Sequence, residues 1–172
     1  MTNHISERHN LPVGMAEPLL LPDEVLDFIQ SGVSVIVGVV GADGRAQAGR
    51  ALATRIVPGG AIRLMYPAEG NLAITASAQS GGPIAVTFSA PISHRTIQLK
   101  AASSRLEQME PEDRINVDAQ MDAFAGVLRA LGFPPPFIQS FCANRSKSIS
   151  VLSFVPQEAF EQTPGPGAGR EL

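Results

Sequence analysis

The chain has 172 residues, of which 44% are hydrophobic and 17% charged, and its formal net charge is −3. That length suits one domain with a real buried core, and the composition excludes a disordered chain. The sequence contains no run of Lys and Arg, so its charge gives no indication of a nucleic-acid partner.

The cysteine count and the N-terminal sequence indicate where the protein works. Cys142 is the only cysteine, so no disulfide can form within the chain, which fits a reducing compartment. Residues 1–10 are polar and lack the apolar segment of a signal peptide. The longest apolar stretch, residues 33–40, is too short to cross a bilayer. We therefore expect a cytoplasmic protein with no membrane contact.

The first half of the chain begins with a flexible arm and a helix and continues as strands. Residues 1–18 are expected to form the arm, and residues 21–32 a short helix with two acidic residues in its first turn. Valines at alternate positions then predict a strand over residues 33–40. Asp43 and Gly44 predict a tight turn, because Asp-Gly supplies the positive φ that such turns need.

Four further strands are expected after this turn, with one helix among them. The strands are a returning strand over residues 46–57, a third over 61–66, a fourth over 84–88 and a long fifth over 94–106. A short helix over residues 69–78 separates the third strand from the fourth.

The last third of the chain contains the strongest helical signal. Apolar residues recur at spacings of four and three along residues 111–131, and Gly132 is a fitting end for this helix. Three prolines then predict an extended link, and residues 137–141 a single helical turn. The last expected strand covers residues 148–155. Residues 161–172 are rich in Gly and Pro and are expected to form an irregular tail.

This order of elements predicts a mainly β domain with flanking helices over residues 19–160. Consecutive strands joined by tight turns pair antiparallel. Six short strands with two or three helices suit a closed barrel with the helices packed outside it.

Four stretches of the chain resemble the pyridoxamine 5′-phosphate oxidase-like family of FMN-binding split barrels. They are SVIVGVVGADGRAQ (residues 34–47), RALATR (50–55), EGNLAI (69–74) and HRTIQLKA (94–101). The resemblance implies a six-stranded antiparallel split β-barrel. It also implies a homodimer with FMN at its interface and a flavin-dependent oxidoreductase reaction on a small substrate.

The resemblance places the flavin phosphate beside Arg50 and Arg55. Guanidinium groups suit this role because they bind phosphate oxygens through two N–H groups. Positions five apart on a regular strand face opposite sides, so both arginines reach one phosphate only across a bulge or a turn. The alternative is two solvated arginines on a strand. The other residues that the resemblance assigns to the cofactor are Ala51, Thr54, Met65, Tyr66, Asn71, Leu72, Thr96 and Gln98.

Some of these assignments have a plain structural alternative. Tyr66 is equally consistent with an aromatic side chain at a strand end, and Thr96 and Gln98 with the solvated exterior of a barrel. The family pattern is also broken at Glu69-Gly70, where family members often carry a basic pair. A carboxylate near a phosphate would repel it.

Two other functions therefore remain open. One is a non-catalytic protein that binds a flavin or a haem on the same barrel, since no residue can be assigned a catalytic role. The other is an interaction module whose Gly/Pro-rich tail reaches a partner. The three histidines and the cysteine lack ligand spacing, so no metal site is predicted.

Overall fold

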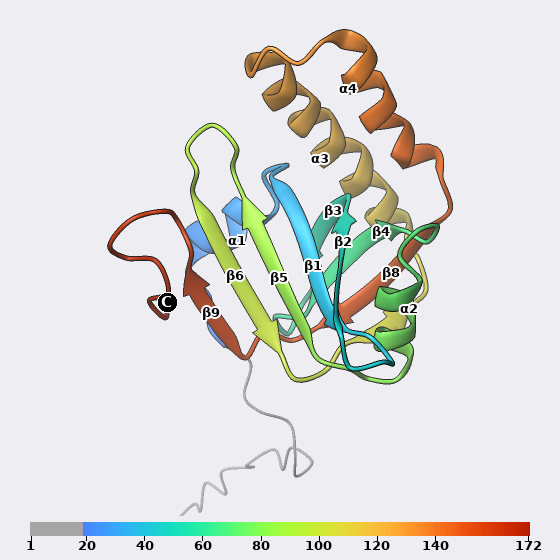
Figure 1. Ribbon diagram of the computed structural model, residues 1–172, viewed down its shortest axis with the longest axis vertical. Helices are drawn as coiled ribbons and strands as arrows, with labels where there is room; N and C mark the ends of the chain where they lie inside the picture. Colours follow the sequence, from blue (N-terminus) through green and yellow to red (C-terminus); the bar gives the residue numbers. More distant parts are fainter. Residues whose placement is uncertain (1–18) are drawn as a thin grey trace, which may run out of the picture.

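The computed structural model describes residues 19–172, so the arm expected at residues 1–18 lies outside the described residues. In this part of the chain, nine strands form two antiparallel sheets (Figure 1). The five-stranded sheet has the strand order β2-β1-β5-β6-β9, and the four-stranded sheet has the order β3-β4-β8-β7.

The bounds of the elements are as follows. The five-stranded sheet consists of β1 (Ser34–Val40), β2 (Ala46–Ala51), β5 (Ile84–Ser89), β6 (Thr96–Ala101) and β9 (Glu158–Glu161). The four-stranded sheet consists of β3 (Ala53–Ile56), β4 (Ile62–Pro67), β7 (Arg105–Glu107) and β8 (Ile149–Phe154). The α-helices are α1 (Asp23–Ile29), α2 (Leu72–Gln79), α3 (Pro111–Ala130) and α4 (Pro135–Cys142), and a 3-10 turn, η1 (Ala143–Ser146), follows α4.

The main hydrophobic core lies between the two sheets. Alternate side chains of each strand point into it, as the period of two in the sequence requires. Burial of each such side chain stabilises the fold by roughly 1.5–3 kcal/mol. Helix α1 contributes three further buried side chains to this core. The core includes Val25, Phe28, Ile29, Val35, Val37, Leu64, Val86, Phe88, Ile97, Leu99 and Leu152.

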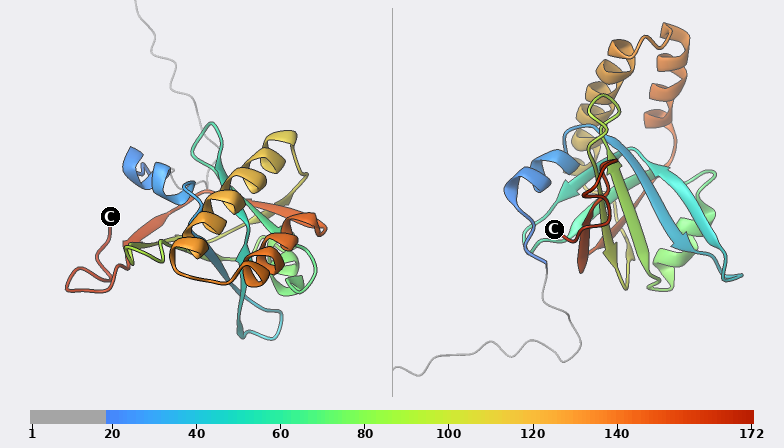
Figure 2. Two further views of the ribbon diagram at one scale, coloured as in Figure 1. Left: turned by 90° about the horizontal axis from the view of Figure 1, so that it is seen from above. Right: turned by 60° about the vertical axis from the view of Figure 1, so that its left-hand side comes forward.

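Helices α3 and α4 form a hairpin on the other face of the four-stranded sheet. Val117 and Met121 of α3 pack against Met65 and Val151 of that sheet. Helix α4 packs on α3, and the hairpin projects beyond the ends of the strands (Figures 1 and 2). The first turn of α4 holds Pro135, where an extended link was predicted. Proline fits there because the first helical residues need no N–H partner.

The structure has nine strands in two sheets where six were predicted, and it does not confirm one closed barrel. One of the additional strands results from a break at Leu52. There the chain passes from the five-stranded to the four-stranded sheet, and the Leu52 N–H donates to the Met65 carbonyl at 2.7 Å. The single strand predicted over residues 46–57 is therefore β2 and β3. The strand predicted over residues 94–106 is likewise divided into β6 and β7 at residues 102–104, where Ser104 bonds to the Gly82 carbonyl.

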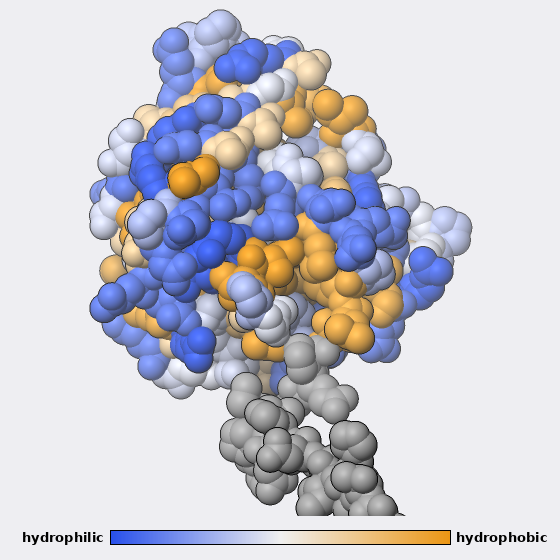
Figure 3. Space-filling view, turned by 180° about the vertical axis from the view of Figure 1, so that it is seen from behind, coloured by the Kyte–Doolittle hydropathy of each residue, from blue (hydrophilic) through white to orange (hydrophobic). Residues whose placement is uncertain are grey.

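The Gly/Pro-rich tail folds back along β9. The Gly169 N–H donates to the Glu161 carbonyl at 2.7 Å, and the Leu172 N–H donates to the Ala159 carbonyl at 2.9 Å. The tail thus covers the β9 edge of the five-stranded sheet with its own backbone groups, and β2 forms the opposite edge. Seen from behind, the molecule is mostly hydrophilic, with an apolar area in its lower half (Figure 3).

Candidate functional site

The outer face of the five-stranded sheet, opposite the core, gathers polar side chains from four strands. Ile36 of β1 lies opposite both Arg50 of β2 and Thr87 of β5, and Thr87 lies opposite Gln98 of β6. These four residues form one line across the strands, which we call the Arg50 row. Because neighbouring strands lie about 4.8 Å apart, the two ends of the row are about 14 Å apart.

Arg50, at one end of the row, is a partly buried cation. Its Nη1 donates to Ser34 Oγ at 2.9 Å, and its guanidinium carbon lies 5.7 Å from the ring centroid of Phe141 in α4. Burial lowers the pKa of Arg50 below its ordinary value. None of the ion pairs among residues 19–172 includes it.

The guanidinium of Arg50 therefore has unused donors. A guanidinium carries five N–H groups, and Ser34 is the one hydrogen-bond acceptor for them within the described residues. Burying part of a charge without a counter-ion raises the free energy of the protein. An anion bound beside Arg50 would supply the counter-ion and offset this rise. The position is chemically suited to bind a phosphate or a carboxylate.

The other end of the row is also polar. Gln98 Nε2 donates to Thr87 Oγ1 at 3.2 Å, and Thr96 Oγ1 donates to Ser89 Oγ at 3.1 Å. Ser34 lies opposite Ser89, so hydroxyl groups connect the strands next to the row. The structure thus brings three predicted site residues, Arg50, Thr96 and Gln98, onto one face.

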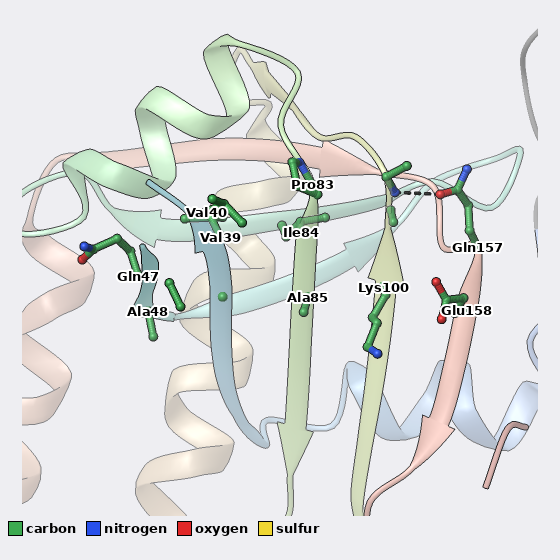
Figure 4. Close-up of a pocket in the computed structure, with 14 residues that line it drawn as sticks. Val39, Val40, Gln47, Ala48, Pro83, Ile84, Ala85, Lys100, Gln157 and Glu158 are labelled. Atoms are coloured by element: carbon green, nitrogen blue, oxygen red, sulfur yellow. Dashed lines mark hydrogen bonds between the residues drawn. The ribbon is translucent and has the colours of Figure 1, made fainter. Parts of the chain in front are cut away.

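A shallow groove of about 590 Å³ adjoins the Arg50 row on the same face, because its lining residues Gly38, Ala48 and Ala85 lie two positions along their strands from that row. Figure 4 shows residues that line this groove. Its floor is low because Gly38, Ala48 and Ala85 lie opposite one another on adjacent strands. Lys100 lines one side, with its ammonium nitrogen 4.4 Å from the ring centroid of Phe160. The volume lies within the range of small-molecule sites, roughly 300–1,000 Å³.

Arg55, the second predicted phosphate ligand, is not beside Arg50. Its Nε donates to Asp113 Oδ1 at 2.8 Å, and its Nη2 pairs with Glu110 at the start of α3. Arg63 of β4 joins the same cluster through Asp113. Two carboxylates already neutralise the charge that a phosphate would need.

Three groups of this cluster, Arg55, Arg63 and Asp113, have shifted pKa values. A hydrogen bond to Asp113 raises the pKa of Arg63, and burial opposes this rise. Burial acts to lower the pKa of Arg55, but hydrogen bonds to Asp113 and Glu110 outweigh it, so this pKa is raised. Burial acts to raise the pKa of Asp113, yet its hydrogen bonds from Arg63, from the Glu110 N–H and from Arg55 hold it below its ordinary value.

Four of the predicted residues, Ala51, Thr54, Met65 and Tyr66, are buried. The Tyr66 hydroxyl lies 3.1 Å from Thr75 Oγ1, and burial raises the pKa of Tyr66. The Gln120 amide of α3 bonds to both the N–H and the carbonyl of Thr54. None of these four side chains reaches the outer face of the five-stranded sheet.

The two remaining predicted residues lie at the start of α2. Asn71 Nδ2 donates to the Pro67 carbonyl at 2.8 Å, and Leu72 is 77% exposed. Asn71 also borders β2, because a Cβ atom added at Gly49 would lie 2.0 Å from Asn71 Oδ1. That the ten residues bind a cofactor stays a prediction.

Sequence reasoning missed several residues of this face. Ile36 could have been found, because a turn centred on Asp43 places it opposite Arg50. Ser34 lies two residues before Ile36 on the same strand, so the alternation of side chains places it on the same face. Phe141 carries no such signal, since it reaches Arg50 only through the packing of the α3–α4 hairpin.

Neither a metal cluster nor a membrane span is found in the part of the chain that the structure describes. No three His, Cys, Asp or Glu side chains gather there in an arrangement that could hold a metal ion. No helix there is long and apolar enough to cross a membrane.

No family model matches the sequence, and no curated protein matches it. Solved structures do match. HupZ from Group A Streptococcus is 14% identical, with a TM-score of 0.53 over 87% of this chain and 100% of that chain. A Clostridium acetobutylicum protein related to general stress protein 26, of the pyridoxinephosphate oxidase family, is 14% identical, with a TM-score of 0.46 over 80% and 84%. HutZ, the heme storage protein of Vibrio cholerae, is 13% identical, with a TM-score of 0.46 over 83% and 95%.

Identities this low establish the fold and nothing more. The chain is mainly β with flanking helices and antiparallel sheets, and it has the fold of the pyridoxamine 5′-phosphate oxidase-like proteins. The resemblance seen in the sequence is confirmed at this level.

Proposed function

We propose that the protein binds FMN on the outer face of its five-stranded sheet, as a cytoplasmic homodimer that encloses the flavin between two chains. In this proposal it is an oxidoreductase that acts on a small molecule. The flavin, when bound, supplies the electron chemistry, and the protein supplies binding and orientation.

One observation carries the proposal, namely the free guanidinium of Arg50. Arg55, the other predicted phosphate ligand, and Arg63 are instead held by Asp113 and Glu110. Arg50 has a hydroxyl and an aromatic ring as its partners, and neither cancels its charge. It is therefore the residue that we expect to hold the flavin phosphate.

The Arg50 row and the residues next to it fit an extended planar ligand. Ile36 offers an apolar surface next to Arg50, and Thr96 and Gln98 offer hydroxyl and amide groups toward the other end. A ligand lying on this open face would have one side exposed to water. A second chain covering that side would bury it, which supports the proposal of a dimer.

Flavin binding is tested by the absorbance spectrum of the purified protein and by calorimetric titration with FMN. We expect bound FMN, and we expect Arg50→Ala to raise its Kd roughly 10- to 100-fold, because a hydrogen bond to a charged group contributes about 1.5–3 kcal/mol. Arg129→Ala, at an exposed position of α3, is the matched control and should leave the Kd unchanged. A colourless protein that gives no heat with FMN would refute the proposal.

A second candidate function is non-catalytic binding of a flavin or a haem on the same face. It is favoured by the composition of the Arg50 row, which contains no carboxylate, histidine or cysteine to act as a general acid or base. Two further features leave few cations for a phosphate. The charge of Arg55 is neutralised by Asp113 and Glu110, and the exposed Glu69 stands before α2 where family members often carry a basic residue.

Turnover separates the two functions. Under the first, NAD(P)H or another reductant reduces the bound flavin and an oxidant reoxidises it over many cycles. Under the second, the bound flavin is never reduced or reoxidised, or the protein prefers haemin to FMN in parallel titrations. The molar mass of the protein in solution, measured with and without ligand, tests directly whether it is a dimer.

A further inference from the structure

Arg50 is held by an aromatic ring from a distant part of the chain. Phe141 lies near the C-terminal end of α4, and its centroid is 5.7 Å from the guanidinium carbon of Arg50. This distance lies within the roughly 6 Å over which a cation and a ring face attract each other. Arg50 thereby links the five-stranded sheet to the α3–α4 hairpin.

The ring of Phe141 is itself firmly placed. Its centroid lies 5.2 Å from that of Phe124 on α3, and it packs against both the cluster under α3 and the cluster between α3 and α4. Met65 and Val117 belong to the first cluster, and Leu128 and Ile138 to the second. A side chain packed on two sides has little freedom to move.

An aromatic ring and a carboxylate can both orient an arginine, but they differ in their effect on its charge. The carboxylate of Asp113 fixes Arg55 and Arg63 but also cancels their charge. The ring of Phe141 restricts Arg50 without supplying a negative charge, and it shields one side of the guanidinium from water. The N–H groups of Arg50 then remain free for an external anion.

We infer that Phe141 is a positioning residue that makes the Arg50 site selective for a phosphorylated ligand. This inference rests on the proposed function and adds two features to it. The site prefers FMN to riboflavin, and this preference depends on the ring of Phe141. The loss of the ring weakens the grip on the phosphate and leaves the binding of the flavin ring unchanged.

The experiment compares FMN and riboflavin binding by quenching of flavin fluorescence. For Phe141→Leu, we expect the Kd of FMN to rise about 3- to 10-fold, the range that a cation–π contact of moderate burial implies, while the Kd of riboflavin stays constant. Phe141→Trp keeps an aromatic face and should preserve the preference for FMN.

Phe137→Leu is the matched control, because it makes the same change on the same helix at a side chain that is 47% exposed and stacked on Phe133. It should alter neither Kd. Thermal melts of all variants show whether each one folds.

The outcomes are distinct. Equal rises in both Kd values for Phe141→Leu, or an unchanged ratio, would overturn the role of Phe141 and leave the proposed function standing. A wild-type protein that binds FMN and riboflavin equally well would overturn the role of Phe141 and also that of Arg50 as the phosphate ligand, while flavin binding itself would stand. A wild-type protein that binds neither flavin refutes the proposed function, and the inference falls with it.

Discussion

Arg63 of β4 and Asp113 in the first turn of α3 form a two-point ion pair. Arg63 Nε donates to Oδ1 at 3.1 Å, and Nη2 donates to Oδ2 at 2.7 Å. The Asp113 side chain is fully buried, and its Oδ2 also accepts the Glu110 N–H at 2.9 Å. This pair fixes the start of the α3–α4 hairpin to the four-stranded sheet, and the hairpin in turn holds Phe141 beside Arg50.

Asp113→Asn is expected to lower the free energy of unfolding by about 3–5 kcal/mol, because it leaves two guanidinium groups without a buried counter-ion. Urea unfolding followed by circular dichroism measures the loss. Asp118→Asn on the same helix is the control, because Asp118 is half-exposed and should change stability by roughly 0.5 kcal/mol or less. Similar losses in the two variants would contradict this role for Asp113.

The same carboxylate predicts sensitivity to acid. The pKa of Asp113 in the folded protein lies below its unfolded value of about 3.9. A lowered pKa stabilises the fold above the unfolded pKa, and this stability is lost as the pH falls through the folded pKa. We therefore expect little change in stability between pH 7 and pH 5, and a fall below about pH 4.

Unfolding free energies measured from pH 7 down to pH 3 test this expectation, with Asp113→Asn as the comparison. The variant should show a smaller fall. Part of the fall should remain, because hydrogen bonds from Ser153 and Thr163 also lower the pKa values of Glu107 and Glu161. Parallel curves for the two proteins would show that Asp113 does not contribute.

The positions of most strands and helices could be predicted, because alternation of apolar residues and turn residues are local signals. The period of two in β1 and the Asp43-Gly44 turn fixed the β1–β2 hairpin correctly. The break at Leu52 has no comparable signal. Its cause is the bond to Met65 and the burial of both residues under α3, which are tertiary contacts.

The candidate site shows the same limit more strongly. Arg50 could be recognised as a cation on a strand, and the structure places it on the outer face with Thr96 and Gln98. The pairing of Arg55 joins residues that lie 58 positions apart. No local sequence pattern indicates that Arg55 pairs with the buried Asp113. Nor does one indicate that Arg50 has no carboxylate partner among the described residues.

Gly49 of β2 is required by the close approach of α2. A Cβ atom added there would lie 2.0 Å from Asn71 Oδ1 and 2.7 Å from Ile74 Cδ1. Asn71 could move only by giving up the hydrogen bond from its Nδ2 to the Pro67 carbonyl. Gly49→Ala is therefore expected to destabilise the protein by about 1–3 kcal/mol, as measured by urea unfolding.

Gly126→Ala supplies the matched control for Gly49→Ala. Gly126 lies inside α3, and nothing lies within 4 Å of a Cβ atom added there. The same change should stabilise the protein by roughly 0.5–1 kcal/mol, because alanine loses less backbone entropy than glycine in a helix. Opposite signs for the two variants would show that the contact between β2 and α2 governs Gly49. A neutral Gly49→Ala would mean that Asn71 yields easily, and Asn71 would then be too loosely held to orient a ligand beside β2.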